Sequence, residues 1–306
     1  MNVVFDRVRC HLAREVFVLL ACLACGAARA ALPFNLPPVN DPASTEHHPG
    51  KVIWADLVTP NLAAAETFYS GLFGWTFQDI HTVDSDYAIV LLGGRPIAGV
   101  LQKAIPAGSE RRQPTWLTFI AVLDVDAARR IALSQGAKSV YEPKTYPRRG
   151  RQAVLSDPQG AVFAMLASSS GDPPDYLAMP GDWIWSSVFA RDPNQDAGFY
   201  KAVFGYDVFD LPSDDGAQHV ILSSDDYARA GINTLPPGRR LPHWLDFIRV
   251  VDAVESSVKA VALGGRVLVE PFVDRHGGKI AVVADPMGAP IGLMEWSETD
   301  SKVEPK

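Results

Sequence analysis

A short loop near the C-terminal end of the sequence, "DRHGGK" at 274–279, carries three side chains that could hold an anion. Arg275, His276 and Lys279 supply hydrogen-bond donors, and the glycines between them would let the loop close over a carboxylate or a phosphate. A solvent-exposed hairpin explains the same residues equally well, because charged residues and glycines are common at turns. The loop therefore indicates either an anion-binding site or an ordinary turn.

Other arginines could bind an anion as well. Arg148, Arg149 and Arg151 form a small basic patch, which we interpret as a solvated loop because short charge runs are usually exposed. Arg249 lies in the apolar segment "WLDFIRVV", which is typical of a strand. An arginine there needs a carboxylate, main-chain carbonyls or a ligand as its partner, and we predict that Arg249→Ala weakens the binding of an anionic ligand.

The sequence lacks the residue patterns of several common catalytic sites. His81, His219 and His243 are isolated from one another, and there is no Ser-His-Asp order, phosphate loop or dinucleotide fingerprint. The formal net charge of -7 and the absence of long basic runs argue against nucleic acid as the main partner. With 306 residues, 47% hydrophobic and 21% charged, the chain has the composition of a globular protein with room for two domains.

The first thirty residues have the pattern of a secretory signal peptide. Arginines precede the apolar run "VFVLLACLACGAA" and small residues follow it, so we expect cleavage after Ala30 and a periplasmic or extracellular location. The run is too short to span a bilayer. Cys22 or Cys25 could instead be the lipid-anchored cysteine of a lipoprotein, although simple export matches the residues better. With Cys10 these are all the cysteines, so the cleaved chain has no disulfide, thiol nucleophile or thiolate metal site.

Beyond the signal peptide (1–30) and a Pro-rich linker (31–50), the sequence contains one domain twice. Three stretches of the first copy match three of the second: "WADLVTPNLAAAETFYSGLFGW" (54–75) with "WSSVFARDPNQDAGFYKAVFGY" (185–206), "WLTFIAVLDVDAA" (116–128) with "WLDFIRVVDAVES" (244–256), and "AVLSDPQGAVFAML" (153–166) with "AVVADPMGAPIGLM" (281–294). We therefore place the two domains at 51–168 and 182–297, with a linker at 169–181 and a C-terminal tail at 298–306.

Each copy alternates strand and helix patterns in the same order. Alternating apolar residues in "VIWADLV" predict a strand, and the Ala-rich "LAAAETFYSGLF" has the apolar spacing of a helix. Gly74, or Gly205 in the second copy, is expected to end that helix in the left-handed conformation. Three strands follow, and the second half of each copy repeats the series. The pattern predicts an α+β fold of two tandem domains, each a pair of βαβββ modules, and a packing role for "FYSGLFGW" and "FYKAVFGY".

On these motifs the chain resembles the vicinal-oxygen-chelate superfamily, which includes glyoxalase I, bleomycin-resistance proteins and extradiol dioxygenases. The resemblance rests on "TPNLAAAETFYSGLFGW", "DVDAARRIALSQGA" and "DPQGAVFAML" in the first copy, and on "FYKAVFGY", "VVDAVESSVKAVALGGRV" and "DPMGAPIGLMEW" in the second. It covers nearly all of the chain after the linker and is closest to tandem glyoxalase-like members. It implies curved mixed sheets that enclose a ligand cleft in each domain.

The resemblance also implies where a divalent metal would bind. Enzymes of the family hold the ion with His, Gln or Glu on the first and last strands of the modules, because such an ion needs nitrogen or oxygen donors. The matching positions carry side chains that do not bind metals: Trp54, Leu117, Ala164, Trp185, Leu245 and Gly292. Gln102 and Asn233, near the module ends, are weak donors. We therefore predict no metal cofactor, and expect a divalent ion only if the protein is a lyase or dioxygenase after all.

Residues two apart on a strand share a face, which extends these positions to a set of ligand-binding candidates. The candidates are Trp54, Asp56, Phe119, Trp185, Ser187, Phe247 and Arg249, joined by Arg275 and His276 of the loop. The first cleft would be apolar with one carboxylate, and the second aromatic with one guanidinium, which suits a carboxylate or phosphate. Equally, the tryptophans could simply fill space, and Asp56 is either a general base or a carboxylate paired at the rim. No catalytic residue can be assigned.

Three functions fit these residues. We favour an exported, metal-free protein, monomeric or homodimeric, that binds a small anionic or aromatic molecule in its clefts. The first alternative is a metal-dependent lyase or dioxygenase of the glyoxalase type. The second is a structural or interaction protein whose clefts are vestigial.

Overall fold

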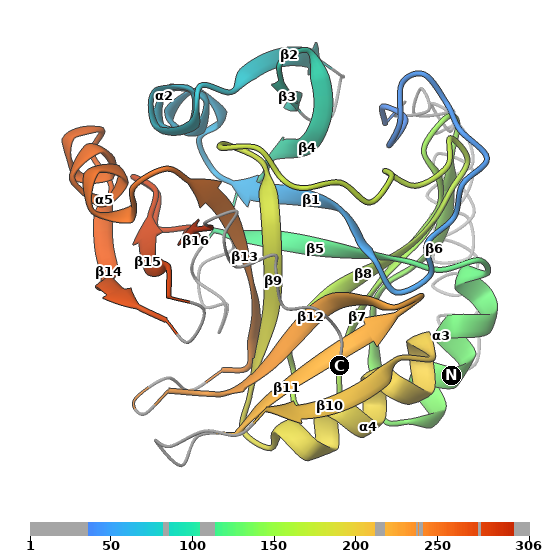
Figure 1. The fold of residues 1–306 in the computed structure, drawn as a ribbon. Coiled ribbons are helices and arrows are strands. Elements are labelled where there is room, and N and C mark those ends of the chain that lie inside the picture. The colour runs from blue at the N-terminus through green and yellow to red at the C-terminus, as the bar shows by residue number, and fades with distance from the viewer. Residues whose placement is uncertain are drawn as a thin grey trace, which may run out of the picture. The chain divides into compact units, whose positions relative to one another are not determined.

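The structure, a computed structural model, describes residues 36–81, 86–104, 114–211, 218–236, 238, 241–274 and 277–296. Two mixed sheets of eight strands each make up most of it (Figure 1). The predicted signal peptide with its cysteines lies outside the described residues, and so do Arg275 and His276. Among the helices that are described, none combines the length and the apolar character needed to cross a membrane.

The elements of the first sheet follow one another along the chain as β1 (Val52–Thr59), α2 (Leu62–Phe73), β2 (Thr76–His81), β3 (Asp86–Leu92), β4 (Arg95–Gln102), β5 (Thr115–Ala121), α3 (Val125–Ser134), β6 (Lys138–Tyr146), β7 (Gly150–Ser156) and β8 (Val162–Ser168). The strand order is β2-β3-β4-β1-β5-β8-β7-β6. The first strand of each βαβββ module therefore lies at the centre of the sheet.

The second sheet repeats this arrangement. Its elements are β9 (Trp183–Ala190), α4 (Pro193–Phe204), β10 (Asp207–Leu211), β11 (His219–Ser224), β12 (Tyr227–Thr234), β13 (His243–Val250), α5 (Ala253–Ala262), β14 (Arg266–Val273), β15 (Lys279–Ala284) and β16 (Pro290–Glu295). The strand order is β10-β11-β12-β9-β13-β16-β15-β14. The prediction of an α+β fold with two tandem domains, each a pair of βαβββ modules, is confirmed.

The first helix of each domain begins and ends at the residues that the sequence indicates. Asn61 and Asp192 precede α2 and α4, and each side chain accepts a main-chain N–H of the first turn, at 3.0 and 3.1 Å. Gly74 and Gly205 follow the two helices with φ of 73° and 75°. This left-handed conformation disfavours residues with a Cβ, which explains why glycine ends both helices.

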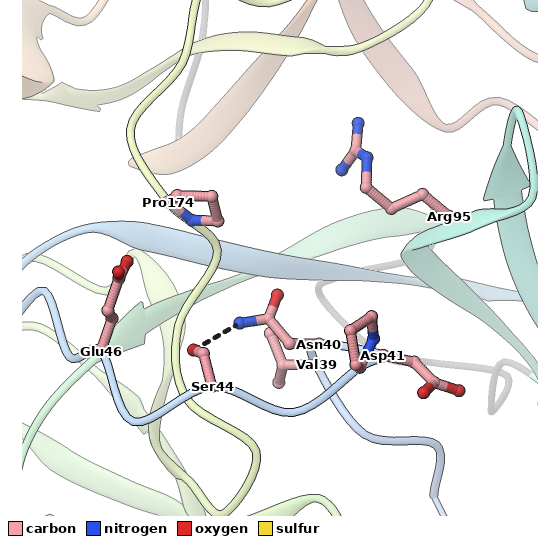
Figure 2. A pocket seen from close by; sticks show the side chains of 8 residues that line it. Val39, Asn40, Asp41, Ser44, Glu46, Arg95 and Pro174 are labelled. Atoms are coloured by element: carbon pink, nitrogen blue, oxygen red, sulfur yellow. Dashed lines mark hydrogen bonds between the residues drawn. The ribbon is translucent and has the colours of Figure 1, made fainter.

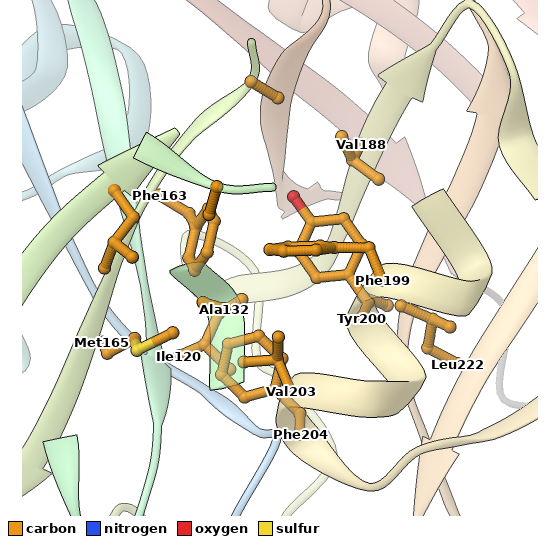
Figure 3. Packing of buried hydrophobic residues seen from close by; sticks show 14 of the residues in the cluster. Ile120, Ala132, Phe163, Met165, Val188, Phe199, Tyr200, Val203, Phe204 and Leu222 are labelled. Carbon is orange, nitrogen blue, oxygen red and sulfur yellow. The ribbon is translucent and has the colours of Figure 1, made fainter. Parts of the chain in front are cut away.

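The helices join modules of different domains. Helix α2 contacts α5, and α3 contacts α4, so the front module of one domain shares a core with the back module of the other (Figure 1). In one of these cores, shown in Figure 3, Ile120, Phe163 and Met165 of the first domain pack with Phe199 and Leu222 of the second. Full burial of such a side chain contributes about 1.5–3 kcal/mol, so the two domains stabilise each other.

The tyrosine of each repeated phrase adds a polar contact between the domains. Tyr200 Oη donates to Asp157 Oδ2 at 3.0 Å and accepts a hydrogen bond from Trp244 Nε1 at 2.9 Å. In the same way Tyr69 Oη lies 3.4 Å from Asp285 Oδ2. Each aspartate belongs to the "DP-x-G" motif of the other domain. The repeated phrase therefore has the packing role that its sequence predicts, with a buried hydrogen bond as well.

Part of the predicted Pro-rich linker is fixed to the domains. Leu36 and Val39 are only 5% and 2% exposed, and the main-chain N–H of Val39 donates to Ser170 Oγ at 3.0 Å. Residues 36–50 run beside the segment that follows β8, where the Ser44 N–H also donates to the Ser170 carbonyl at 2.9 Å. Residues 36–50 of the Pro-rich linker are therefore held against the domains by buried apolar side chains and long-range hydrogen bonds.

Alternation along the strands separates the two sides of each sheet. On β1, Ala55 and Leu57 face α2 and its core, so Trp54 and Asp56 point to the opposite side. We call this opposite side the distal face. In the first sheet it carries Trp54, Asp56, Tyr87, Gly99, Leu117, Phe119, Val154 and Ala164, and in the second Trp185, Ser187, Phe189, His219, Gly231, Asn233, His243, Leu245, Phe247 and Gly292.

Candidate functional site

The strand register gathers the candidates of the first domain at the centre of its distal face. Asp56 pairs with Gly99 on β4 and with Leu117 on β5. Trp54 pairs with Phe119 on the same β5. Because cross-strand partners project to the same side of a sheet, Trp54, Asp56 and Phe119 lie side by side.

The strand pairing places the predicted metal positions in two neighbouring rows of this face. Ala164 on β8 pairs with Phe119, and Phe119 pairs with Trp54, whereas Leu117 pairs with Asp56. The parallel pairs at the centre of the sheet are Asp56 with Gly99 and Phe119 with Ala164. Spacing in the sequence predicts the face of these residues but not their pairing along it.

The second domain brings its own candidates together in the same geometry. Phe247 pairs with Trp185 on β9 and with Gly292 on β16, while Ser187 pairs with Gly231 on β12. A Cβ on Gly292 would lie 2.1 Å from the Phe247 ring, so glycine is what allows the ring to lie flat across this position. Phe247 is buried and Trp185 is partly exposed.

Asp56 is a partly buried carboxylate held by two neighbouring side chains. Its Oδ1 accepts hydrogen bonds from Trp54 Nε1 at 2.7 Å and from Tyr87 Oη at 2.9 Å. Burial raises the pKa of Asp56, while the nearby Arg149 guanidinium and the two hydrogen bonds act in the opposite direction. Gly99 leaves room for this arrangement, because a Cβ there would lie 1.8 Å from Tyr87 Oη. Of the two predicted roles for Asp56, the structure shows a carboxylate paired with neighbours.

Arg149 is the residue of this site that the sequence did not reveal. Its guanidinium carbon lies 3.9 Å from the centre of the Trp54 ring, Nη2 lies 3.5 Å from Tyr87 Oη, and the residue is only 1% exposed. The interpretation as a solvated loop is therefore wrong for Arg149. It agrees with the structure for Arg148, which is exposed, and for Arg151, which pairs with Asp126 at the surface.

The conformation of the β6–β7 hairpin explains why Arg149 turns inward. Arg148 has a φ of 68° and Gly150 a φ of 115°. A Cβ on Gly150 would lie 2.0 Å from the carbonyl oxygen of Ala167, so only glycine allows this approach to β8. Because the φ angles of both neighbours lie in the left-handed region, the Arg149 side chain points inward and its guanidinium lies over the Trp54 ring on the distal face.

The second domain replaces these charged groups by neutral ones. Trp185 Nε1 donates to Ser187 Oγ at 2.9 Å, where the first domain has Trp54 and Asp56. His219, whose Nδ1 lies 2.6 Å from Asn233 Oδ1, holds the place of Tyr87. Alignment of "RRGRQAVLSD" with "HGGKIAVVAD" puts Gly277 in the place of Arg149.

One end of this second distal face carries a further pair of rings. Phe189 stacks on His243, with ring centres 5.3 Å apart and planes 15° from parallel. Asn233 pairs with Phe189 on the neighbouring strand. His219 and His243, which look isolated in the sequence, therefore lie in one row across the sheet. The face as a whole offers aromatic surface and neutral hydrogen-bonding groups.

Arg249 has a structural partner. Its Nη1 donates to the Ala178 carbonyl at 2.6 Å and its Nη2 to the Trp296 carbonyl at 3.1 Å. Of the three partners that the sequence left open, the structure shows main-chain carbonyls. Binding of an anion by Arg249 stays a prediction. Gln102, a weak candidate ligand, accepts from the Leu62 N–H at 2.9 Å and so caps α2 on the other side of the sheet.

A cavity of about 310 Å³ is lined by residues that belong to neither distal face. They are Val39, Asn40, Asp41, Pro42, Ser44, Glu46, Arg95 and Pro174 (Figure 2). The Arg95 guanidinium is already paired with Asp182 and lies 5.1 Å from the Tyr176 ring. Since its charged group has partners and the rest of the lining is an extended segment, we assign no chemistry to this cavity.

Two family models match the chain, one in each domain. The Glyoxalase/Bleomycin resistance protein/Dioxygenase superfamily matches residues 51–165, and the Glyoxalase-like domain matches residues 186–294. "Putative glyoxylase CFP32" of Mycobacterium tuberculosis (strain CDC 1551 / Oshkosh) is 30% identical over 257 residues, which are 83% of this chain and 98% of that protein. The chain belongs to the glyoxalase/bleomycin resistance/dioxygenase superfamily.

Other members of the superfamily are similar over the same range. "Anthracycline biosynthesis protein DauV" of Streptomyces sp. (strain C5) is 32% identical over 273 residues, covering 83% of this chain and 96% of its own. Among solved structures, the Mn(II)-bound glyoxalase from Novosphingobium aromaticivorans has a TM-score of 0.57 at 14% identity, covering 81% of this chain and 83% of its own. The 2,3-dioxygenase LapB from Pseudomonas sp. KL28 has a TM-score of 0.55 at 13% identity, covering 83% and 94%. At these identities the solved structures show the shared fold alone.

The metal that superfamily enzymes hold does not fit the side chains at the corresponding positions. The central positions of the two distal faces are Asp56, Gly99, Phe119 and Ala164 in the first domain and Ser187, Gly231, Phe247 and Gly292 in the second. A divalent ion needs three or four nitrogen or oxygen ligands, and each set supplies one. Across the part of the chain that the structure describes, no group of three or more His, Cys, Asp or Glu side chains could hold a metal ion.

Proposed function

We propose that this protein binds a small organic molecule on the distal faces of its two sheets and does so without a resident metal ion. The observation that carries the proposal is the composition of the two central sets, with one carboxylate in the first domain and one hydroxyl in the second. The remaining positions are glycine, alanine and phenylalanine, which carry no polar side-chain atoms. Apolar surroundings with a few fixed polar groups are typical of small-molecule sites.

The second domain supports an aromatic ligand in particular. Trp185, Phe189 and Phe247 lie on one face, and Trp185 and Phe189 are partly exposed. Offset or edge-on contacts between aromatic rings contribute about 0.5–1.5 kcal/mol beyond the burial of area. A relative named for anthracycline biosynthesis supports the same class of ligand, because anthracyclines are planar and polycyclic.

The proposal also covers where the protein works. The arginines, the apolar run and the small residues before Ala30 support export to the periplasm or the outside of the cell. Fractionation of cells that express the full chain, with N-terminal sequencing of the product, tests this. A mature N-terminus at Ala31 in the exported fraction is expected, whereas an uncleaved chain in the cytoplasm contradicts it.

Metal analysis separates this proposal from a metal-dependent lyase or dioxygenase, which the family name supports as the second candidate. The full chain purified without chelators is expected to contain well under one zinc, nickel, manganese or iron ion per chain. Reconstitution with each ion is expected to leave its melting temperature unchanged. A stoichiometric ion that survives dialysis, and whose loss lowers the melting temperature, would overturn the metal-free reading.

Ligand-dependent melting separates binding from a purely structural role. A ligand present at a hundred times its dissociation constant stabilises the folded state by about 2.7 kcal/mol. We expect at least one member of a panel of aromatic acids and neutral polycyclic aromatics to raise the melting temperature of the full chain. Binding by both domains predicts two classes of ligand whose effects add, because the two faces differ in charge.

A further inference from the structure

We propose that the distal face of the first sheet binds a small organic carboxylate, whose charge is held by the guanidinium of Arg149. This inference rests on the proposed function, since it names the class of ligand for one of its two sites. The second domain has Gly277 in the corresponding place and is not expected to share the preference.

The buried guanidinium has donors that no described residue uses. Nε and Nη1 of Arg149 are buried and have no hydrogen-bond partner among the described residues, and Nη2 makes one long contact of 3.5 Å with Tyr87. Burying a charged group whose donors are unpaired is costly, so such groups normally have partners. An acceptor that carries a negative charge is the partner that a guanidinium fits best, and a carboxylate can accept two of its N–H groups at once.

Asp56 does not supply that acceptor. Its Oδ1 is already bonded to Trp54 Nε1 and Tyr87 Oη, at 2.7 and 2.9 Å. These bonds hold the carboxylate against β1 while the Arg149 guanidinium lies over the Trp54 ring. The Arg149 guanidinium is close enough to Asp56 to oppose the rise that burial causes in the pKa of that carboxyl. One guanidinium beside one partly buried carboxylate suits a monoanion and disfavours phosphate dianions, which the carboxylate would repel more strongly.

The surroundings define the rest of the ligand. Phe119 on β5, Ala164 on β8 and Val154 on β7 lie in one row on the same face, and all three are buried and apolar. Gln152, two residues before Val154 on β7, has a buried Oε1 without a hydrogen-bond partner among the described residues. These surroundings favour an acid with an apolar or aromatic body, and Gln152 offers an acceptor for a donor on that body.

Matched pairs of acids and amides test the inference on the full chain. The probes are benzoate, phenylacetate and 2-naphthoate, each compared with its carboxamide, and inorganic phosphate as a second anion. Thermal melting and titration calorimetry are run on the wild type, Arg149→Met, Arg149→Lys and the surface control Arg151→Met. Methionine keeps an unbranched apolar stem beside Trp54 and removes the donors.

The expected result is that at least one acid binds the wild type and Arg151→Met at least tenfold more tightly than its amide. A charge-assisted hydrogen bond contributes about 1.5–3 kcal/mol, so Arg149→Met should lose about 10-fold to 100-fold in affinity for the acid. Arg149→Lys keeps the charge but not the planar pair of donors, and should lie in between. Phosphate should not compete.

The other outcomes are decisive in different ways. Equal binding of acid and amide, or unchanged affinity for the acid in Arg149→Met, overturns the carboxylate inference and leaves the proposed function standing. Competition by phosphate with equal strength overturns the choice of a monoanion. The probes are tested at concentrations up to about 10 mM, which also detects dissociation constants in the millimolar range. If no acid, amide or neutral aromatic changes the melting temperature of the wild type, both the inference and the proposed function fail.

Discussion

The replacement of Asp246 by asparagine is expected to remove a pH dependence from the stability of this protein. Asp246 is 2% exposed and lies where the two sheets meet, with Thr118 Oγ1 of the first sheet donating to its Oδ2 at 2.9 Å. Ser186 Oγ donates to its Oδ1 at 2.6 Å. Burial raises the pKa of Asp246 to about 6, although the two hydroxyl hydrogen bonds favour the charged form.

The direction follows from comparing the folded and unfolded chains. The ordinary pKa of the carboxyl is 3.8, and its folded pKa is about 6, so the folded protein binds the proton more tightly. The stabilisation is fully present below pH 3.8 and is lost as the pH rises through about 6. A difference of about 2 pKa units is worth about 3 kcal/mol, at about 1.36 kcal/mol per unit. Asparagine does not ionise and lacks this pH dependence.

Urea unfolding at several pH values between about 4 and 7 measures the effect. The free energy of unfolding of Asp246→Asn, relative to wild type, should rise by about 3 kcal/mol across this range. Asp196, whose pKa burial raises to about 7, is present in both proteins and cancels in the difference. Asp126→Asn is the control, because Arg151 lowers the pKa of that exposed carboxyl. A relative stability of Asp246→Asn that stays constant with pH would refute the reasoning.

Four further substitutions test other parts of the structure by urea unfolding. Gly99→Ala should destabilise the protein by about 2–4 kcal/mol, because its Cβ would lie 1.8 Å from a buried tyrosine hydroxyl. Gly231→Ala meets a serine hydroxyl at 2.8 Å and the Trp185 ring at 3.3 Å and should cost only about 1 kcal/mol; equal losses would contradict this. Tyr200→Phe should lower the free energy of unfolding by about 1–3 kcal/mol, because Asp157 Oδ2 loses the hydroxyl that donates to it at 3.0 Å. An unchanged free energy of unfolding would show that this hydrogen bond does not stabilise the protein. Arg249→Met should cost about 2 kcal/mol, because two main-chain carbonyls lose their donor, and unchanged stability would contradict this.

Much of the fold could be predicted because the sequence states it twice. A helix pattern that ends in glycine at both Gly74 and Gly205, followed each time by strand patterns, leaves little freedom for the order of elements. The pairing of modules across domains could not be predicted in the same way. It depends on Tyr200 meeting Asp157 and on α3 meeting α4, contacts between segments that alternation within one copy does not reveal.

The site was predictable only where side-chain direction follows from alternation. Trp54, Asp56 and Phe119 share a face because they lie on regular strands, and the sequence predicts that face. Arg149 lies in a turn, where direction depends on backbone angles rather than on alternation. Its inward course requires the close contact of Gly150 with the carbonyl of a neighbouring strand, which is a tertiary interaction. A glycine directly after two arginines was the one local signal.

The charged residues that distinguish the first distal face from the second depend on one another, because burying a single charge is costly. An arginine that is 1% exposed needs a nearby negative charge, and Asp56 supplies it where Ser187 in the other domain would not. Conversely, burial raises the pKa of a carboxyl, as it does for Asp246, and at Asp56 the guanidinium acts in the opposite direction. The charged groups of the first face are therefore expected to be present together or absent together. Because the backbones match while these groups differ, the proposed binding by both faces predicts two ligands of different charge rather than two copies of one.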